Sequence, residues 1–269
     1  MKVADRIKSF RNLMGNKKID YYIISSGDAH QSEYVCDHYR GRAYMSGFTG
    51  SAGTLLIGLD KVILWTDGRY FIQAEDQLKG SGIELFKMRI PGWPTLEEWL
   101  MDNMKAGETL AFDGKTFSIN SYKNFKNIEN KKKINIKIDE DLLDEVWINR
   151  PELPNGEAFI HNIKYCGKSA GEKINEVREK MKELGAENYI IASLDDIAWL
   201  YNIRGNDIHC NPVVISYALI KETEAFLYVD KNKISNEMEK DLNRNGITVK
   251  GYNELIDGIK VLKGTILID

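Results

Sequence analysis

Several residue types that define common protein classes are scarce in this sequence. The chain of 269 residues contains 5 prolines, 3 cysteines and 4 histidines. So few prolines, together with 43% hydrophobic residues, argue against intrinsic disorder. Cys36, Cys166 and Cys210 are odd in number and unclustered, which is typical of free thiols in a reducing cytoplasm rather than of a disulfide framework. With four histidines in the whole chain, a histidine-rich metal site is not expected.

The sequence also lacks a charge excess and long hydrophobic runs. Lysine and arginine number 37 against 40 acidic residues, a net charge of −3, so no basic surface for a nucleic acid backbone is expected. The longest apolar stretch, residues 212–220, is too short to cross a membrane. The first six residues contain no apolar signal core. We therefore expect a cytoplasmic protein with neither nucleic acid nor membrane as a partner.

The most informative feature that is present is an internal repeat. An amphipathic helix precedes a buried strand twice, first at residues 3–14 and 21–24, then at 174–184 and 189–191. Two hairpin-like strands follow each time, 54–57 with 62–65 and 213–219 with 225–229. A helix, a strand, a second helix and a closing strand complete each repeat (70–77, 83–87, 96–104 and 109–113; 234–242, 247–250, 253–261 and 265–269). The pattern predicts a duplicated α/β architecture in which helices flank mixed sheets.

The two repeats are separated by a segment with linker composition. Residues 150–156 carry two prolines and a glycine, which predicts domains at 1–150 and 151–269. The first repeat continues beyond its closing strand through residues 119–128, 134–138 and 142–147, whereas the second reaches Asp269 on its closing strand. Because domain termini usually fray at the surface, we expect a second domain truncated at its C-terminal end and a longer parent protein.

The glycine cluster at residues 47–53 (GFTGSAG) is not predicted to bind a nucleotide. It lacks the lysine of a phosphate-binding loop and the glycine spacing of a dinucleotide fingerprint. It also precedes a strand, whereas phosphate loops open a helix. A tight entry into the following strand is the simpler interpretation.

A short polar loop places Asp28, His30 and Glu33 close together in sequence. Such a set could serve acid–base chemistry or bind a metal, but no second carboxylate cluster adjoins it, so a polar surface loop is the default expectation. The pairs at 36–38 and 209–210 lack the spacing of a metal motif. No serine, cysteine or histidine combination offers a nucleophile with an evident base.

The segment at residues 65–71 (WTDGRYF) holds the most interesting side chain. Asp67 at the strand end could cap the next helix, as Asp195 and Asp196 could in the second repeat. Arg69 has no comparable local role. A guanidinium on a loop at a strand end suits a grip on a carboxylate or a peptide carbonyl, although an ordinary surface arginine is the alternative.

These segments resemble a known family. Residues 25–34 (SSGDAHQSEY), 46–54 (SGFTGSAGT) and 65–71 resemble the amino-terminal domain of three-domain Xaa-Pro aminopeptidases. Residues 194–207 (LDDIAWLYNIRGND) and 211–213 resemble the middle domain, and 147–151 (WINRP) the connection between the two. The resemblance implies two tandem domains of the creatinase/prolidase N-terminal type. The catalytic pita-bread domain, which would follow them, is absent from this stretch.

The resemblance also implies a division of labour. The missing catalytic domain would carry two divalent metal ions, usually manganese, and none of their five ligands can be placed in this chain. This chain alone is expected to be inactive and to bind no metal. It would gate the cleft for short Xaa-Pro peptides and would contact its own catalytic domain. The resemblance is also compatible with a homodimer of the complete protein. Arg69 would contact substrate, and Asp28, His30 and Asp67 are the candidates for supporting loops.

Two other interpretations remain open at this point. Creatinase-type domains without a working catalytic partner can act as peptide-binding or scaffolding modules. A prolidase or a creatinase-like C–N hydrolase would also carry a pita-bread domain. The motif at residues 25–34 and the duplicated domain favour the aminopeptidase over the second of these.

Overall fold

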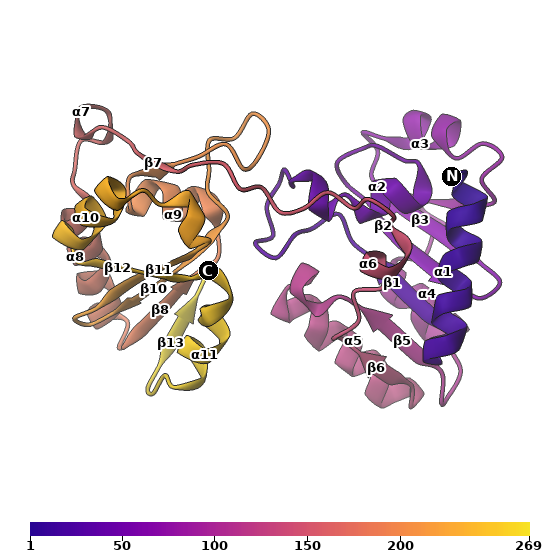
Figure 1. The fold of residues 1–269 in the computed structure, drawn as a ribbon. Helices are drawn as coiled ribbons and strands as arrows, with labels where there is room; N and C mark the ends of the chain where they lie inside the picture. Colours follow the sequence, from indigo (N-terminus) through magenta and orange to yellow (C-terminus); the bar gives the residue numbers. More distant parts are fainter. The chain divides into compact units, whose positions relative to one another are not determined.

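The chain folds into two compact units, Met1–Glu152 and Leu153–Asp269 (Figure 1). The structure, a computed structural model, describes every residue from Met1 to Asp269. Each unit has its own sheet and its own hydrophobic core. Each therefore has the parts of an independent domain.

The first unit alternates helices with strands. Its elements are, in order, α1 (Val3–Lys17), β1 (Tyr21–Ile24), α2 (Gly41–Ser46), β2 (Thr54–Gly58), β3 (Val62–Thr66), α3 (Phe71–Gln77), β4 (Glu84–Lys87), α4 (Leu96–Asn103), β5 (Thr109–Phe112), α5 (Ile119–Lys132), β6 (Asn135–Lys137) and α6 (Leu143–Val146), with 3-10 turns at Asp37–Tyr39 and Gly114–Thr116. The strands form one six-stranded sheet in the order β4-β3-β2-β1-β5-β6. Only β2 runs antiparallel to its neighbours.

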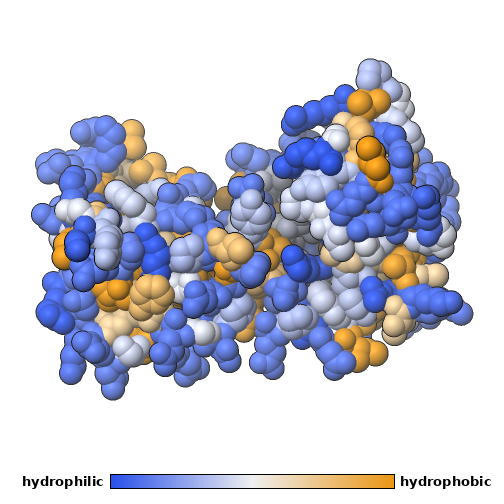
Figure 2. Space-filling model, turned by 90° about the horizontal axis from the view of Figure 1, so that it is seen from above, coloured by the Kyte–Doolittle hydropathy of each residue, from blue (hydrophilic) through white to orange (hydrophobic).

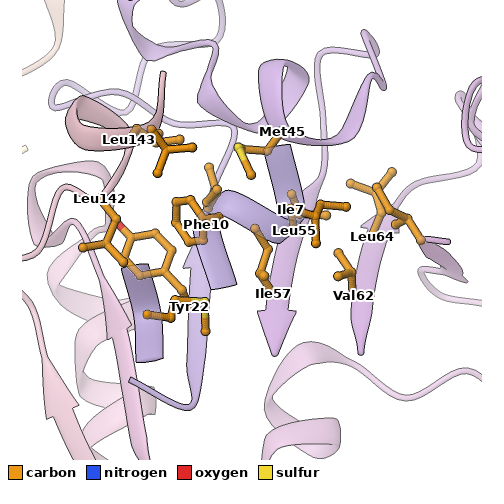
Figure 3. Packing of buried hydrophobic residues seen from close by; sticks show 14 of the residues in the cluster. Ile7, Phe10, Tyr22, Met45, Leu55, Ile57, Val62, Leu64, Leu142 and Leu143 are labelled. Carbon is orange, nitrogen blue, oxygen red and sulfur yellow. The ribbon is translucent and has the colours of Figure 1, made fainter. Parts of the chain in front are cut away.

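Both faces of this sheet are covered by helices, because successive strand residues point to opposite sides. On β1, Tyr22 and Ile24 face one core and Ile23 faces the other. The first core contains side chains from α1, α2, α3 and α6, and Figure 3 shows Ile7 and Phe10 of α1 lying over Leu55 and Ile57 of β2. The second core lies under α4 and α5. The unit is a three-layer α/β/α domain.

The second unit repeats this plan with fewer elements. They are β7 (Phe159–Ile160), α7 (Ile163–Cys166), α8 (Ala170–Glu183), β8 (Asn188–Ile191), α9 (Leu194–Leu200), β9 (Ile203–Arg204), β10 (Ser216–Lys221), β11 (Ala225–Val229), α10 (Asn236–Arg244), β12 (Ile247–Gly251), α11 (Leu255–Lys260) and β13 (Ile266–Ile268), with 3-10 turns at Lys231–Lys233 and Tyr252–Glu254. The main sheet has the order β12-β11-β10-β8-β13, and β7 pairs with β9 separately. Helices α8, α9 and α10 cover one face and α11 the other.

The two sheets confirm the predicted duplication. Strand β10 runs antiparallel to β8 and β11, as β2 does to its neighbours in the first unit. Strands β12 and β13 run parallel to their partners, as β4 and β5 do in the first unit. The strand order matches across five positions. The sequence prediction of a mixed, partly antiparallel sheet flanked by helices is confirmed for both units.

One predicted strand begins later than its hydrophobic run. The prediction began at Val213, but β10 begins at Ser216. The backbone of residues 212–215 bonds to a loop instead, since the Ile215 N–H donates to Asp207 Oδ2 at 2.6 Å and the Asp207 N–H donates to the Val213 carbonyl at 3.3 Å. Val213 to Ile215 are buried all the same. Burial therefore explains their hydrophobicity without a place in the sheet.

The visible surface in Figure 2 is largely hydrophilic, with hydrophobic residues in scattered patches. Exposed large side chains include Ile72, Tyr165 and Trp199. None of the helices combines the length and the apolar character that crossing a membrane requires.

Candidate functional site

Four chain segments meet at one edge of the first sheet. Strands β1, β3 and β5 point the same way, so their carboxyl ends lie at a common edge, where the antiparallel β2 begins. The segments there are residues 25–34, 47–54, 66–70 and 113–116, which we call the strand-end loops. Crevices outside the carboxyl ends of strands are the usual ligand sites of open α/β sheets. Three of the four segments carry the motifs that the sequence resemblance depends on.

Side-chain hydroxyls join these loops to one another. Ser26 Oγ donates to the Gly53 carbonyl at 2.6 Å, and Thr66 Oγ1 donates to the Ala52 carbonyl at 2.6 Å. Ser25 Oγ donates to the Thr116 carbonyl at 3.2 Å. Serine and threonine at strand ends thus donate hydrogen bonds to loop carbonyls that have no partner strand beyond the end of the sheet. The loops form one bonded surface.

The glycines of the 47–53 segment are needed for close approach. A Cβ on Gly50 would lie 2.3 Å from Phe48 Cζ and 2.8 Å from Tyr70 Cδ1, and a Cβ on Gly53 would lie 2.8 Å from the Trp65 carbonyl oxygen. Gly47 has a φ of +75° and ends α2. These contacts agree with the predicted tight entry into β2. The segment leads into a strand and not into a helix whose N-terminus could hold a phosphate.

Asp67 and Arg69 form a bidentate ion pair at the end of β3. Arg69 Nε donates to Asp67 Oδ1 at 3.0 Å, and Arg69 Nη2 donates to Asp67 Oδ2 at 2.8 Å. The hydrogen bonds from Arg69 lower the pKa of the Asp67 carboxyl, and the same bonds raise the pKa of the guanidinium. The Arg69 side chain is 65% exposed. An exposed pair of this kind contributes little to stability, about 0–1 kcal/mol, so its main consequence is orientation.

The pair leaves one side of the guanidinium available. Asp67 takes the Nε–Nη2 side, whereas Nη1 and the outer hydrogen of Nη2 have no protein acceptor. The Arg69 guanidinium carbon also lies 5.2 Å from the centroid of the Tyr70 ring. Arg69 thus presents three N–H groups to solvent, two on Nη1 and one on Nη2, while Asp67 holds the other edge of the guanidinium. Such a fork suits a carboxylate or a peptide carbonyl.

Asp67 does not cap the next helix, which corrects the sequence prediction. Helix α3 begins at Phe71, and its N-cap residue is Tyr70, without a side-chain cap. Asp67 Oδ1 accepts the Arg69 backbone N–H at 3.0 Å, closing a turn before the helix. In the second unit, Ser193 caps α9 by accepting the Asp196 N–H, so Asp195 and Asp196 lie in the first turn and not at the cap.

Asp28 and His30 are buried, and the expectation of a polar surface loop is wrong for both residues. Asp28 is 0% and His30 4% exposed. Asp28 Oδ1 accepts the backbone N–H groups of His30 and Ser32, each at 2.9 Å. The carboxylate closes the loop on itself, a common use of aspartate after a strand. These bonds support a loop-shaping role for Asp28.

Sequence reasoning missed a buried cation at the centre of the strand-end loops. Arg42 lies on α2 and is 6% exposed. Its Nε donates to Ser26 Oγ at 2.9 Å, its Nη1 donates to the Phe48 carbonyl at 3.0 Å, and its Nη2 donates to the Gly50 carbonyl. The only available signal was its helical spacing from the buried Met45 and Ser46, and an arginine in such a position is ordinarily assumed to face solvent.

The residues of this chain do not fit a di-nuclear metal centre. No group of three or more histidine, cysteine, aspartate or glutamate side chains is arranged to hold a metal ion. His38, two residues after Cys36, bonds through Nδ1 to the Pro151 carbonyl at 2.8 Å. Cys210 is exposed and Cys36 is buried, and neither is part of a disulfide.

The duplicated sheets and the strand-end loops define a chain built from tandem copies of one α/β domain. Two profiles, both described as Creatinase/Prolidase N-terminal domain, match residues 6–144 and 149–269. The chain belongs to the creatinase/prolidase N-terminal domain family. The sequence resemblance and the predicted fold class are confirmed.

The relatives are much longer than this chain. Xaa-Pro aminopeptidase 1 of Dictyostelium discoideum is 37% identical in an alignment 267 residues long, which covers 96% of this chain and 42% of that protein. Aminopeptidase P2 of Arabidopsis thaliana is 38% identical, over 97% of this chain and 37% of its own length. X-prolyl aminopeptidase of Caenorhabditis elegans, described as a cytosolic enzyme with a di-nuclear active site, matches with a TM-score of 0.92 and 28% identity, over 96% of this chain and 44% of that one. The chain spans about two fifths of the length of these relatives.

Proposed function

We propose that this chain is the N-terminal region of a metal-dependent Xaa-Pro aminopeptidase, an enzyme that removes the residue before proline. The relatives support this proposal, since aminopeptidases from a slime mould and a plant match nearly the whole chain. In this proposal the two units shape and gate the substrate cleft of a catalytic domain outside the 269 residues. That domain would be their main partner, and short Xaa-Pro peptides would be the substrate.

The metal chemistry belongs outside this chain in the proposed arrangement. The C. elegans relative is described as having a di-nuclear active site, while no side-chain group here fits such a centre. We infer that the catalytic domain binds two divalent metal ions, and we propose that these are manganese. A cytoplasmic location is inferred from the cytosolic description of that relative.

Arg69 is the residue through which we propose that this chain touches substrate. The observation that carries this role is the side-on pair with Asp67, which holds the guanidinium and leaves three N–H groups, on Nη1 and Nη2, without a protein acceptor. A peptide carbonyl or terminal carboxylate could accept one N–H from Nη1 and one from Nη2. One charge-assisted clamp of this kind aligns a peptide for attack by a nucleophile held elsewhere.

The test compares the complete protein encoded by the gene with the 269-residue chain. With added Mn²⁺, the complete protein is expected to release the first residue of Xaa-Pro peptides and to leave matched Xaa-Ala peptides intact. The 269-residue chain is expected to show neither turnover nor stoichiometric manganese uptake. Turnover by this chain alone would contradict the proposal. Peptide binding without hydrolysis by the complete protein would instead favour a peptide-binding module.

A further inference from the structure

Arg42 carries a buried charge that no carboxylate neutralises. The side chain forms no ion pair, and burial lowers the pKa of its guanidinium to about 10. A buried charge is costly unless it is paired or fully hydrogen-bonded. Here neutral oxygens of Ser26, Phe48 and Gly50 take the place of a counter-ion. A cation held at such cost requires an explanation beyond packing, because an apolar side chain would fill the same space.

The three oxygens belong to two different strand-end loops. Ser26 follows β1, while Phe48 and Gly50 precede β2. We call residues 47–53 the glycine segment. Ser26 also bonds to the Gly53 carbonyl at 2.6 Å, so both ends of this segment are held. The planar guanidinium with its fixed directions of donation sets the spacing of these acceptors. Arg42 therefore determines the shape of the glycine segment.

The glycine segment in turn contacts the residue next to Arg69. Tyr70 OH and Ser51 Oγ are hydrogen-bonded at 2.7 Å, and the Tyr70 ring packs edge-on against Phe48 at 5.9 Å. The Arg42 guanidinium carbon lies over the same Phe48 ring, 4.9 Å from its centroid. Tyr70 carries the ring beside which the Arg69 guanidinium lies. A continuous set of contacts runs from Arg42 through the glycine segment to Arg69.

We propose that Arg42 is a positioning residue that fixes the glycine segment and Tyr70, and through them the direction in which Arg69 presents its free N–H groups. Arg42 touches no peptide in this scheme. Its effect on hydrolysis rests on the proposed function, whereas its effect on Arg69 does not. Lysine cannot replace it, because one ammonium group cannot meet three oxygens at the same geometry.

The chain offers a matched control in Arg6. Arg6 lies on α1, places its guanidinium 4.2 Å from the Tyr44 ring centroid and donates to the Tyr44 carbonyl. It thus makes the same kinds of contact as Arg42 without reaching the strand-end loops. Arg6→Lys removes a guanidinium–aromatic contact and a carbonyl hydrogen bond from the same domain, and only Arg42→Lys should disturb Arg69.

The first experiment uses NMR on the 269-residue chain. Arg42→Lys is expected to speed amide exchange of residues 48–53 at least tenfold and to abolish contacts between the Arg69 side chain and the Tyr70 ring. Arg6→Lys should change neither. Retained Arg69–Tyr70 contacts in folded Arg42→Lys would overturn the proposal. If that variant does not fold, Tyr70→Phe tests the proposal instead, because it removes only the hydroxyl that is hydrogen-bonded to Ser51. Unchanged amide exchange at residues 49–52 in this variant would overturn the proposal.

The second experiment is a double-mutant cycle in the complete peptidase. Arg42→Lys and Arg69→Ala are each expected to lower kcat/KM at least tenfold, and the double variant should be no worse than Arg69→Ala, because both changes remove one clamp. Multiplying losses would overturn the positioning role, since a general loss of stability adds to the effect of Arg69→Ala. If Arg69→Ala alone leaves the kinetics unchanged, the proposed substrate contact fails, while the NMR result still decides the role of Arg42.

Discussion

Asp67 and Asp230 hold equivalent positions in the two units. Each directly follows the second strand of a hairpin, Asp67 after β3 and Asp230 after β11. Each accepts at Oδ1 the backbone N–H of the residue two positions later, at 3.0 Å. That residue is Arg69 in the first unit and Asn232 in the second. The aspartate turn is thus common to both copies, whereas the guanidinium belongs to one copy only.

This relationship predicts that Arg69→Asn removes function without removing structure. The variant copies the second unit, and the turn is retained because Asp67 bonds to the backbone of residue 69. We expect a change in unfolding free energy below about 0.5 kcal/mol, as is usual for an exposed site. In the complete protein, kcat/KM for Xaa-Pro peptides should fall at least tenfold, about 1.4 kcal/mol of transition-state binding.

The matched control for this prediction is Asn232→Ala, which changes the equivalent position of the second unit. It should leave kcat/KM unchanged. Equal losses for the two variants would mean that Arg69 acts through general domain stability and has no contact with substrate.

A second prediction concerns two glycines of the first unit. Gly50→Ala places a methyl group 2.3 Å from Phe48 Cζ, and we expect a loss of about 1–3 kcal/mol in unfolding free energy from overpacking. Gly15→Ala, in α1 with nothing within 4 Å of the new Cβ, should instead stabilise by about 0.5–1 kcal/mol. Chemical denaturation measures both, and equal effects would contradict the crowding at Gly50.

The buried ion pair of the second unit gives a third prediction. Lys233 Nζ lies 2.6 Å from Asp207 Oδ2, and both side chains are at most 3% exposed. Lys233→Met leaves the Asp207 charge buried without its partner and should cost about 3–5 kcal/mol. The control is Lys231→Met, which removes an exposed pair with Glu254 and should cost less than about 1 kcal/mol. Amide exchange in β10 and β11 reports on this unit specifically.

A fourth prediction concerns the pH dependence of stability at Asp113. Burial raises the pKa of its carboxyl above the ordinary value of 3.8. A raised folded-state pKa stabilises the fold below the ordinary pKa, and this contribution is lost as pH rises through the folded-state value. Asp113→Asn cannot ionise and retains an oxygen for the Lys115 N–H. The variant should therefore melt at a higher temperature than the wild type at pH 7, with the difference shrinking toward pH 4.

Hydrophobic spacing was enough to predict the main elements. Ile7, Phe10 and Met14 recur at helical spacing and are all buried under α1. The two hairpins and the parallel strands after them follow in order from runs of apolar residues and the breaks between them. The repeat itself required only that two such series be compared. Each of these patterns is local, and local patterns decide which side of an element faces a core.

The bonds within the strand-end loops were not predictable in the same way. Asp28 and Arg42 have charged side chains, and their types favour the surface, yet both are buried. Asp67 was expected to cap a helix and binds Arg69 instead. Such outcomes depend on which loops meet at a sheet edge, and no spacing along the chain records that meeting.

The sequence by itself determined the alternation of helices and strands, their duplication and the family, because all three are carried by residue types in order along the chain. Only the tertiary structure decided that residues 26, 42, 50 and 69 share one bonded edge. The physical reason is that β1 pairs with β2 and with β5, more than eighty residues further on, in a register set by the packing of both sheet faces. That pairing brings distant loops within hydrogen-bonding distance.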